Sequence, residues 1–158
     1  MNRKTKYLTQ GALIAALYVV LTYITNLAGM ASGAVQVRIS EALCVLPAFT
    51  APAVPGLFIG CLVANLLTGA ALWDVVFGSV ATLLGALGTR YFGKNKFLAP
   101  LFPIVSNTVI VPFVLKIAYG VSQGYLFLVL SIFIGEVISC GVLGILLYKA
   151  LEKKRIFE

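Results

Sequence analysis

Long apolar stretches, separated by short groups of polar residues, cover most of the 158-residue chain. A helix that crosses a membrane needs about 20 mainly apolar residues. The breaks between the stretches contain glycine, proline or charged residues, which end helices. The second stretch is the shortest, because it ends before Pro52 and Pro55. The pattern therefore predicts an all-α protein with six transmembrane helices, at residues 8–27, 39–49, 54–71, 73–92, 97–119 and 125–151.

The composition agrees with an integral membrane protein. Hydrophobic residues make up 61% of the chain and charged residues only 11%, which lies outside the range of soluble domains. The first apolar stretch is too long for the apolar part of a cleavable signal peptide, so we expect it to remain in the protein. Residues 1–158 are therefore expected to form a single transmembrane domain.

The basic residues predict the orientation. The chain has 12 lysine and arginine residues, and all of them except Arg38 and Lys116 lie at the N-terminus, in the loop 90–96 or at the C-terminus. With six spans these three segments share one side of the membrane. Positive charge favours the cytoplasmic side, so both termini are predicted to be cytoplasmic. The net charge of +7 is explained in this way rather than by nucleic-acid binding.

The remaining polar residues, with their aromatic neighbours, are the candidates for a binding site. In the predicted topology all of them are compatible with one pocket that opens to the outside. These candidates are Arg38, Glu41, Asn65, Trp73, Asp74, Asn107, Lys116, Tyr119 and Glu136. Glu136 is the strongest, because an ionisable side chain in hydrocarbon is costly and its neighbours in sequence are isoleucine, phenylalanine and valine.

Several candidates also have purely structural interpretations. Arg38 and Glu41 are three residues apart and could form an ion pair on one helical turn. Asp74 could cap the N-terminus of the fourth helix. Lys116 could interact with the C-terminal end of the fifth. The sequence leaves these alternatives open.

Asn107 lies close to a helix irregularity. Pro112 has no N–H group, so the carbonyl of Thr108 loses its helical partner and a polar notch forms at mid-membrane depth. The notch could contribute to a ligand site. It could equally be a structural kink in which Asn107 bonds to another helix.

Small residues predict how helices pack. Gly56 and Gly60 repeat at four-residue spacing in the third helix, and Ala12 and Ala16 do so in the first. Such faces let helix backbones approach closely within lipid. We expect the glycine face to pack inside this chain, whereas the alanine face could equally contact another subunit.

The candidate side chains suit a flat heterocycle that donates hydrogen bonds and also carries a positive charge. Carboxylates accept paired N–H donors, and aromatic rings stack on planar ligands. The chain has no histidine and no phosphate-binding loop for ATP, so an enzyme is not expected. No metal or other cofactor is expected either, and Cys44, Cys61 and Cys140 are predicted to be buried free thiols.

The chain resembles the substrate-binding S-components of energy-coupling factor (ECF) transporters. The likeness rests on six helices, a basic cytosolic rim and the Ala12-x-x-x-Ala16 face. The segment Val35-Gln-Val-Arg-Ile-Ser-Glu-Ala-Leu-Cys-Val-Leu-Pro47, with the Trp73-Asp74 turn, is similar to the QueT family in particular.

The resemblance implies a location in a prokaryotic cell membrane and a queuosine precursor as substrate. The candidates are 7-aminomethyl-7-deazaguanine, its cyano analogue and queuine. It also implies a shared transmembrane T-subunit and two ATPase subunits as partners, with Ala12 and Ala16 docking on the T-subunit. The S-component would carry its site across the membrane by toppling, and residues 28–37 would cover the pocket as a lid.

We expect the carboxylates to bind the substrate, Glu136 through its guanine-type edge and Glu41 or Asp74 through its amine. Arg38 would orient Glu41. Amides would read the remaining ring atoms and aromatic rings would stack, a group that comprises Asn65, Asn107, Trp73 and Tyr119.

Two other functional classes are compatible with the sequence. A stand-alone secondary transporter driven by protons would also explain a lone Glu136. A membrane scaffold subunit would bind a partner through the Ala12 face but bind no small molecule.

Overall fold

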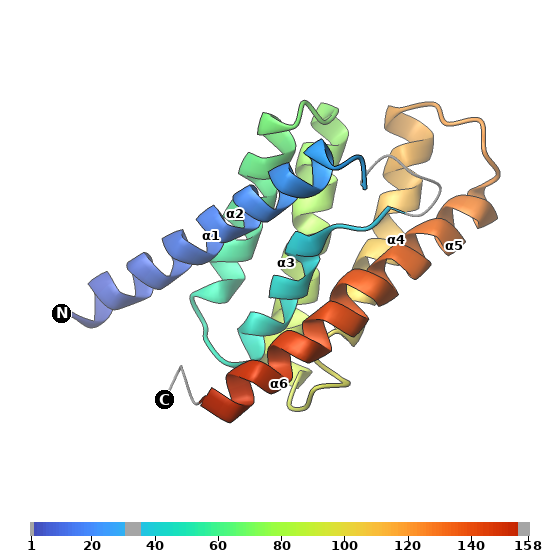
Figure 1. Cartoon of the computed structure of the whole chain (residues 1–158). Helices are drawn as coiled ribbons and strands as arrows, with labels where there is room; N and C mark the ends of the chain where they lie inside the picture. The colour runs from blue at the N-terminus through green and yellow to red at the C-terminus, as the bar shows by residue number, and fades with distance from the viewer. Residues whose placement is uncertain (1, 31–35, 155–158) are drawn as a thin grey trace.

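The computed structural model describes residues 2–30 and 36–154, which contain helices and no strand. Figure 1 shows the helices as one bundle in which α1 and α5–α6 run obliquely to the others. In chain order the elements are α1 (Arg3–Leu27), the 3₁₀-helix η1 (Ile39–Ala48), α2 (Ala53–Leu67), α3 (Leu72–Phe92), α4 (Leu101–Ala118), α5 (Tyr125–Glu136), the π-helix η2 (Val137–Leu143) and α6 (Gly144–Lys154).

Four helices in the described part of the chain are long and apolar enough to cross a membrane. They are Arg3–Leu27, Leu72–Phe92, Leu101–Ala118 and the continuous Tyr125–Lys154, which comprises α5, η2 and α6. Ile39–Ala48 and Ala53–Leu67 are shorter apolar helices. The all-α class is thus confirmed, whereas the six-span topology stays a prediction.

The short helix η1 lies at the centre of the bundle. Residues from α1, α2, α3, α6 and η2 pack against it, and Cys44 and Val45 at its middle are fully buried. The sequence predicted a short helix here, and the structure shows that it is 3₁₀ rather than α. A 3₁₀-helix rises about 2.0 Å per residue, so ten residues extend further than they would in an α-helix.

Glycines bring α1 and α2 into backbone contact. A Cβ atom on Gly56 would lie 2.7 Å from the carbonyl oxygen of Gly11, and one on Gly60 would lie 2.9 Å from Cβ of Tyr18. The predicted small-residue face of α2 therefore packs inside this chain, on α1.

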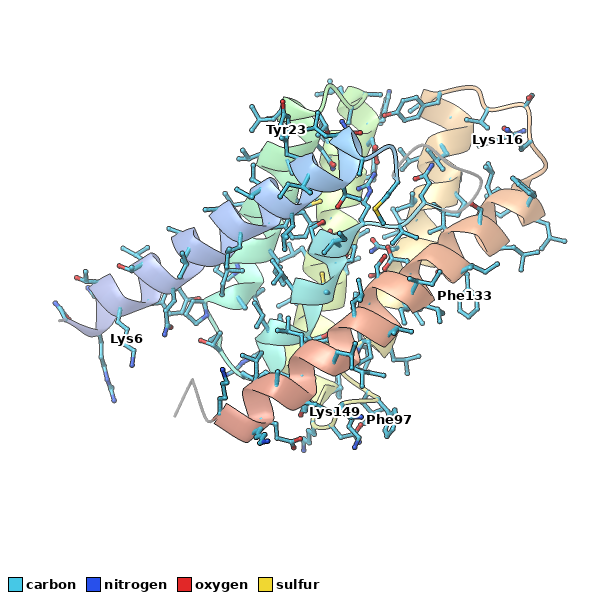
Figure 2. The ribbon with its side chains drawn as sticks, in the orientation of Figure 1. Lys6, Tyr23, Phe97, Lys116, Phe133 and Lys149 are labelled. Atoms are coloured by element: carbon cyan, nitrogen blue, oxygen red, sulfur yellow. The ribbon has the colours of Figure 1, made fainter. Side chains whose placement is uncertain are left out.

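The two ends of the bundle differ in their residues. Figure 2 shows Lys6, Phe97 and Lys149 toward one end, with Tyr23 and Lys116 toward the other. The first end contains the segments that the sequence predicts to be cytoplasmic. The orientation itself, with both termini inside, remains a prediction.

The α1–α2 contact leads to a stability prediction. Replacing Gly60 with alanine should lower the free energy of unfolding by about 1–3 kcal/mol, because the new methyl group overlaps Tyr18. Thermal unfolding of the purified protein in detergent measures the effect. Gly124→Ala is the matched control, since nothing lies within 4 Å of a Cβ atom there. Equal melting temperatures for the two variants would contradict the packing described.

Candidate functional site

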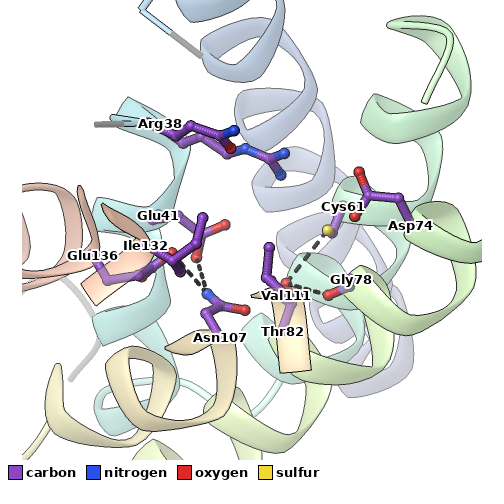
Figure 3. Close-up of a pocket in the computed structure, with 11 residues that line it drawn as sticks. Arg38, Glu41, Cys61, Asp74, Gly78, Thr82, Asn107, Val111, Ile132 and Glu136 are labelled. Carbon is purple, nitrogen blue, oxygen red and sulfur yellow. Dashed lines mark hydrogen bonds between the residues drawn. The ribbon is translucent and has the colours of Figure 1, made fainter. Parts of the chain in front are cut away.

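A small polar cavity, which we call the inner cavity, lies inside the bundle beside η1. Its volume is about 20 Å³, enough for one or two water molecules. Figure 3 shows Glu41, Asn107 and Glu136 on one side of it, with Cys61 and Asp74 on the other. The lining residues are Gln36, Arg38, Glu41, Cys61, Asp74, Gly78, Thr82, Asn107, Val111, Ile132 and Glu136.

Asn107 bridges the two glutamates of the inner cavity. Its Nδ2 donates to Oε1 of Glu136 at 3.0 Å and to Oε2 of Glu41 at 3.4 Å. Glu136 is 9% exposed and Glu41 only 2%. Oε2 of Glu136 is buried and has no hydrogen-bond partner among the described residues. Because buried polar atoms are normally paired, this oxygen is an unsatisfied acceptor on a residue that lines the inner cavity.

Glu41 is bound more completely than Glu136. The hydroxyl of Tyr18 donates to its Oε1, and the thiol of Cys44 donates to its Oε2 at 3.1 Å. These groups and Asn107 hold the carboxyl, so the expected orientation of Glu41 by Arg38 is not what the structure shows. Figure 3 shows the Arg38 side chain extending over the cavity toward Cys61 and Asp74.

The cysteines are free and buried, as the sequence predicted. The ligand atoms of Glu41, Cys44 and Cys140 lie within 4.8 Å of one another. Both thiols already donate to Glu41, Cys140 to its backbone oxygen at 3.1 Å. The trio could hold a soft metal ion only after both thiols lost their protons. Its present geometry is that of thiols that stabilise a buried glutamate.

The segment that carries Gln36 and Arg38 lies directly on α5. A Cβ atom at Gly135 would be 2.0 Å from the carbonyl oxygen of Gln36, so only glycine permits this contact. The backbone N–H of Arg38 donates to Oγ of Ser139 at 3.1 Å. These contacts position both side chains over the inner cavity. The predicted lid, 28–37, falls partly on residues 31–35, which lie outside the described part of the chain.

A second and larger cavity, the outer cavity, adjoins the first. Its volume is about 360 Å³, and it shares Gln36, Arg38 and Asp74 with the inner cavity. That size is within the usual range for small-molecule sites. Its lining residues are Thr22, Asn26, Gln36, Arg38, Asn65, Thr68, Gly69, Ala70, Asp74, Leu115, Tyr119 and Val121.

Asp74 belongs to both cavities and is not a helix cap. Ala71 is the N-cap of α3, and Asp74 follows within the first turn, 6% exposed. The Tyr119 hydroxyl donates to its Oδ2 at 3.4 Å, and Nδ2 of Asn65 donates to its backbone oxygen at 3.4 Å. The structure therefore brings Asp74, Asn65 and Tyr119 together at the cavity junction and in the outer cavity.

Two predicted site residues lie elsewhere. Trp73 is 58% exposed and stacks on Phe77 with ring centroids 5.7 Å apart. The ammonium group of Lys116 donates to the backbone oxygens of Val121 and Gln123 at 3.0 and 3.1 Å, in the connection after α4. Neither residue lines the inner or the outer cavity, so the structure does not place them in this site.

Sequence reasoning missed several residues that line the cavities, and it missed Tyr18, which contacts Glu41 beside them. Tyr18, Thr22 and Asn26 follow one another at four-residue spacing, which places them on one face of α1. This polar stripe in an apolar helix was a usable signal. Cys61 and Thr82 had none, because such residues are common in helix cores and Thr82 also bonds the backbone oxygen of Gly78 at 3.1 Å.

Comparison with known proteins adds an independent result. The sequence pattern of the family described as QueT transporter matches residues 8–153. A protein of Lactococcus lactis subsp. cremoris (strain MG1363), named Queuosine precursor transporter QueT, is 35% identical over 95 residues. The alignment covers 59% of this chain and 55% of that protein, so the chain spans about half the length of this curated relative. No solved structure matches the chain.

The bonding of Glu41 leads to a second prediction. Tyr18→Phe removes a buried donor to its carboxyl and should lower the free energy of unfolding by about 1–3 kcal/mol. Tyr23→Phe is the matched control, because Tyr23 lies on the same helix but is 48% exposed. Thermal unfolding of the two variants in detergent gives the comparison. If Tyr18→Phe is as stable as the control, Tyr18 does not support Glu41.

Proposed function

This chain belongs to the QueT transporter family, and we propose that it binds a queuosine precursor at the outer side of the membrane for uptake into the cell. The substrate would be 7-aminomethyl-7-deazaguanine, its cyano analogue or queuine. The relative from Lactococcus lactis is named for the transport of such a precursor.

The inner cavity is the observation that carries this proposal. Glu41, Asp74 and Glu136 place three carboxyl groups beside a single guanidinium, that of Arg38. Deazaguanines present several N–H donors, which carboxylates and amides accept. A buried acidic side chain in a membrane protein is costly, and Oε2 of Glu136 has no partner in the described part of the chain that would offset this cost. Together with the adjoining outer cavity, which Asn65 lines, the inner cavity suits a hydrogen-bonding heterocycle, with acceptors provided by Glu136 and by the amides of Asn65 and Asn107.

The chain would act as the S-component of an ECF transporter. It contains no phosphate-binding loop for ATP, so a T-subunit and two ATPase subunits would supply the energy. Toppling of this subunit against the T-subunit would then deliver the substrate inward. Both termini would be cytoplasmic in a prokaryotic cell membrane, where the basic end shown in Figure 2 would face the cytoplasm.

The exposed alanine face of α1 is the proposed contact with the T-subunit. Ala12 and Ala16 are exposed, and Ala12 lies in an apolar groove of about 360 Å³ between α1 and α2. Leu13 and Leu17 beside them are 60% and 45% exposed. Small residues allow close helix contact in lipid, which suits a helix of a second subunit.

Calorimetric binding to the purified chain in detergent tests the proposed substrate. We expect 7-aminomethyl-7-deazaguanine to bind with a submicromolar dissociation constant, about −8 kcal/mol or better. Guanine and thiamine are the controls and should bind much more weakly. If none of these binds to a folded, monodisperse sample, the substrate assignment is wrong and the scaffold interpretation gains support. Uptake by the chain alone, driven by a pH gradient, would instead establish a secondary transporter.

The subunit contact is tested by Ala12→Leu. The larger side chain should block helix docking and lower uptake by the assembled transporter by at least about tenfold, since a lost close contact is worth about 1.4 kcal/mol or more. Ligand binding by the isolated chain should not change, because Ala12 lines neither the inner nor the outer cavity. Ala150→Leu, at an exposed position of α6, is the control. Unchanged uptake with Ala12→Leu would exclude this face as the docking surface.

A further inference from the structure

The two cavities differ so much in size that a ligand has only one way to occupy both. The inner cavity, at about 20 Å³, admits a group no larger than a water molecule or two. The outer cavity, at about 360 Å³, has room for a bicyclic ring system. The cavities meet at Gln36, Arg38 and Asp74. A ligand that spans this junction must therefore place its ring outside and a compact substituent inside.

The acceptor groups of the inner cavity indicate which kind of substituent it would bind. The inner cavity contains Oε2 of Glu136, which is buried without a partner, and the carboxyl of Glu41 on the other side of the Asn107 bridge. Both offer acceptors, and together with Asp74 they outnumber Arg38, the cation among the described residues that line the cavity. A primary ammonium group is close to a water molecule in size, has three N–H donors and carries positive charge.

Resting on the proposed function, we propose that the inner cavity is an ammonium subsite in which Glu136 binds the aminomethyl group of the substrate, while the heterocycle lies in the outer cavity. The unpartnered Oε2 accepts one N–H of the ammonium, and the Glu41 carboxyl accepts a second. This orientation replaces the expectation that Glu136 reads the guanine-type edge.

The outer cavity provides the groups that this orientation requires. In a 7-substituted deazaguanine, the guanine-type edge lies on the ring opposite the substituent, so it would face the amides of Asn26 and Asn65. Amides both donate and accept, and therefore match the mixed pattern of that edge. Tyr119, 46% exposed, offers a ring for stacking. The carboxyl of Asp74 remains at the junction.

The orientation discriminates among the three candidate precursors. The cyano analogue carries a neutral group that only accepts hydrogen bonds. This group would offer no donor to the oxygens of Glu41 and Glu136. In queuine the nitrogen of the aminomethyl substituent carries a cyclopentene ring, which a cavity of about 20 Å³ does not admit. The aminomethyl compound alone meets both the size and the charge of the subsite.

Calorimetry with the wild-type protein and all three compounds is the first test. We expect 7-aminomethyl-7-deazaguanine to bind at least about tenfold more tightly than either of the others, because it alone forms charge-assisted hydrogen bonds there. If the cyano compound or queuine binds as tightly, the ammonium subsite is wrong while the proposed function stands. If no compound binds to folded protein, the subsite and the proposed function both fail.

The variant Glu136→Gln tests whether the carboxyl group of Glu136 binds the ammonium group. The amide keeps the size of the carboxyl but loses its charge, so affinity for the aminomethyl compound should fall at least about tenfold. Affinity for the cyano compound should change by less than about threefold, because neither form of the side chain offers it a charge-assisted bond. The ratio between the two ligands, rather than either affinity alone, is the decisive quantity.

Glu152→Gln, an identical change at an exposed position of α6, should leave both affinities unchanged. If Glu136→Gln lost affinity for both ligands equally, Glu136 would contact the heterocycle that they share or would support the fold. Either result would overturn the proposal. Should that variant not fold, the three-ligand comparison with wild-type protein decides the matter.

Discussion

The burial of Glu41 is the constraint on which the rest of this structure depends. A carboxyl group at 2% exposure inside an apolar bundle must be bonded on every side. The carboxyl accepts from Tyr18 on α1, Cys44 on η1 and Asn107 on α4. The backbone oxygen of Glu41 accepts from Cys140 on η2. The relative positions of these elements are thereby tied to one residue.

The same network is left incomplete at one atom. Asn107 satisfies one oxygen of Glu136, and the other has no partner in the described part of the chain. A partly satisfied buried network costs stability. Natural proteins accept such costs at functional sites. A ligand that donates to this oxygen would supply the missing hydrogen bond. The interaction that the free protein lacks would then contribute to the free energy of binding.

Irregular backbone surrounds the site. The 3₁₀-helix η1 and the π-helix η2 replace regular α-helix next to the inner cavity, and the extended segment at Gln36 lies against Gly135. Non-helical backbone within a membrane is tolerated where it is buried in protein or lines a cavity. Both conditions hold here. These irregular elements direct Arg38, Glu41 and Cys140 toward a region that straight helices would fill with apolar side chains.

The sequence by itself determined the helical class, the approximate positions of the helices and the identity of the buried carboxyl and amide residues of the described part of the chain. Glu136, Asn107 and Glu41 could be singled out because polar groups in apolar stretches are costly. Only the tertiary structure decided which of the candidates meet. It placed Trp73 and Lys116 outside the site and brought Tyr18, Thr22 and Asn26 into or beside it. Helices that are apolar on all sides carry no signal for their rotation, so the direction of each side chain became known only once the helices had packed.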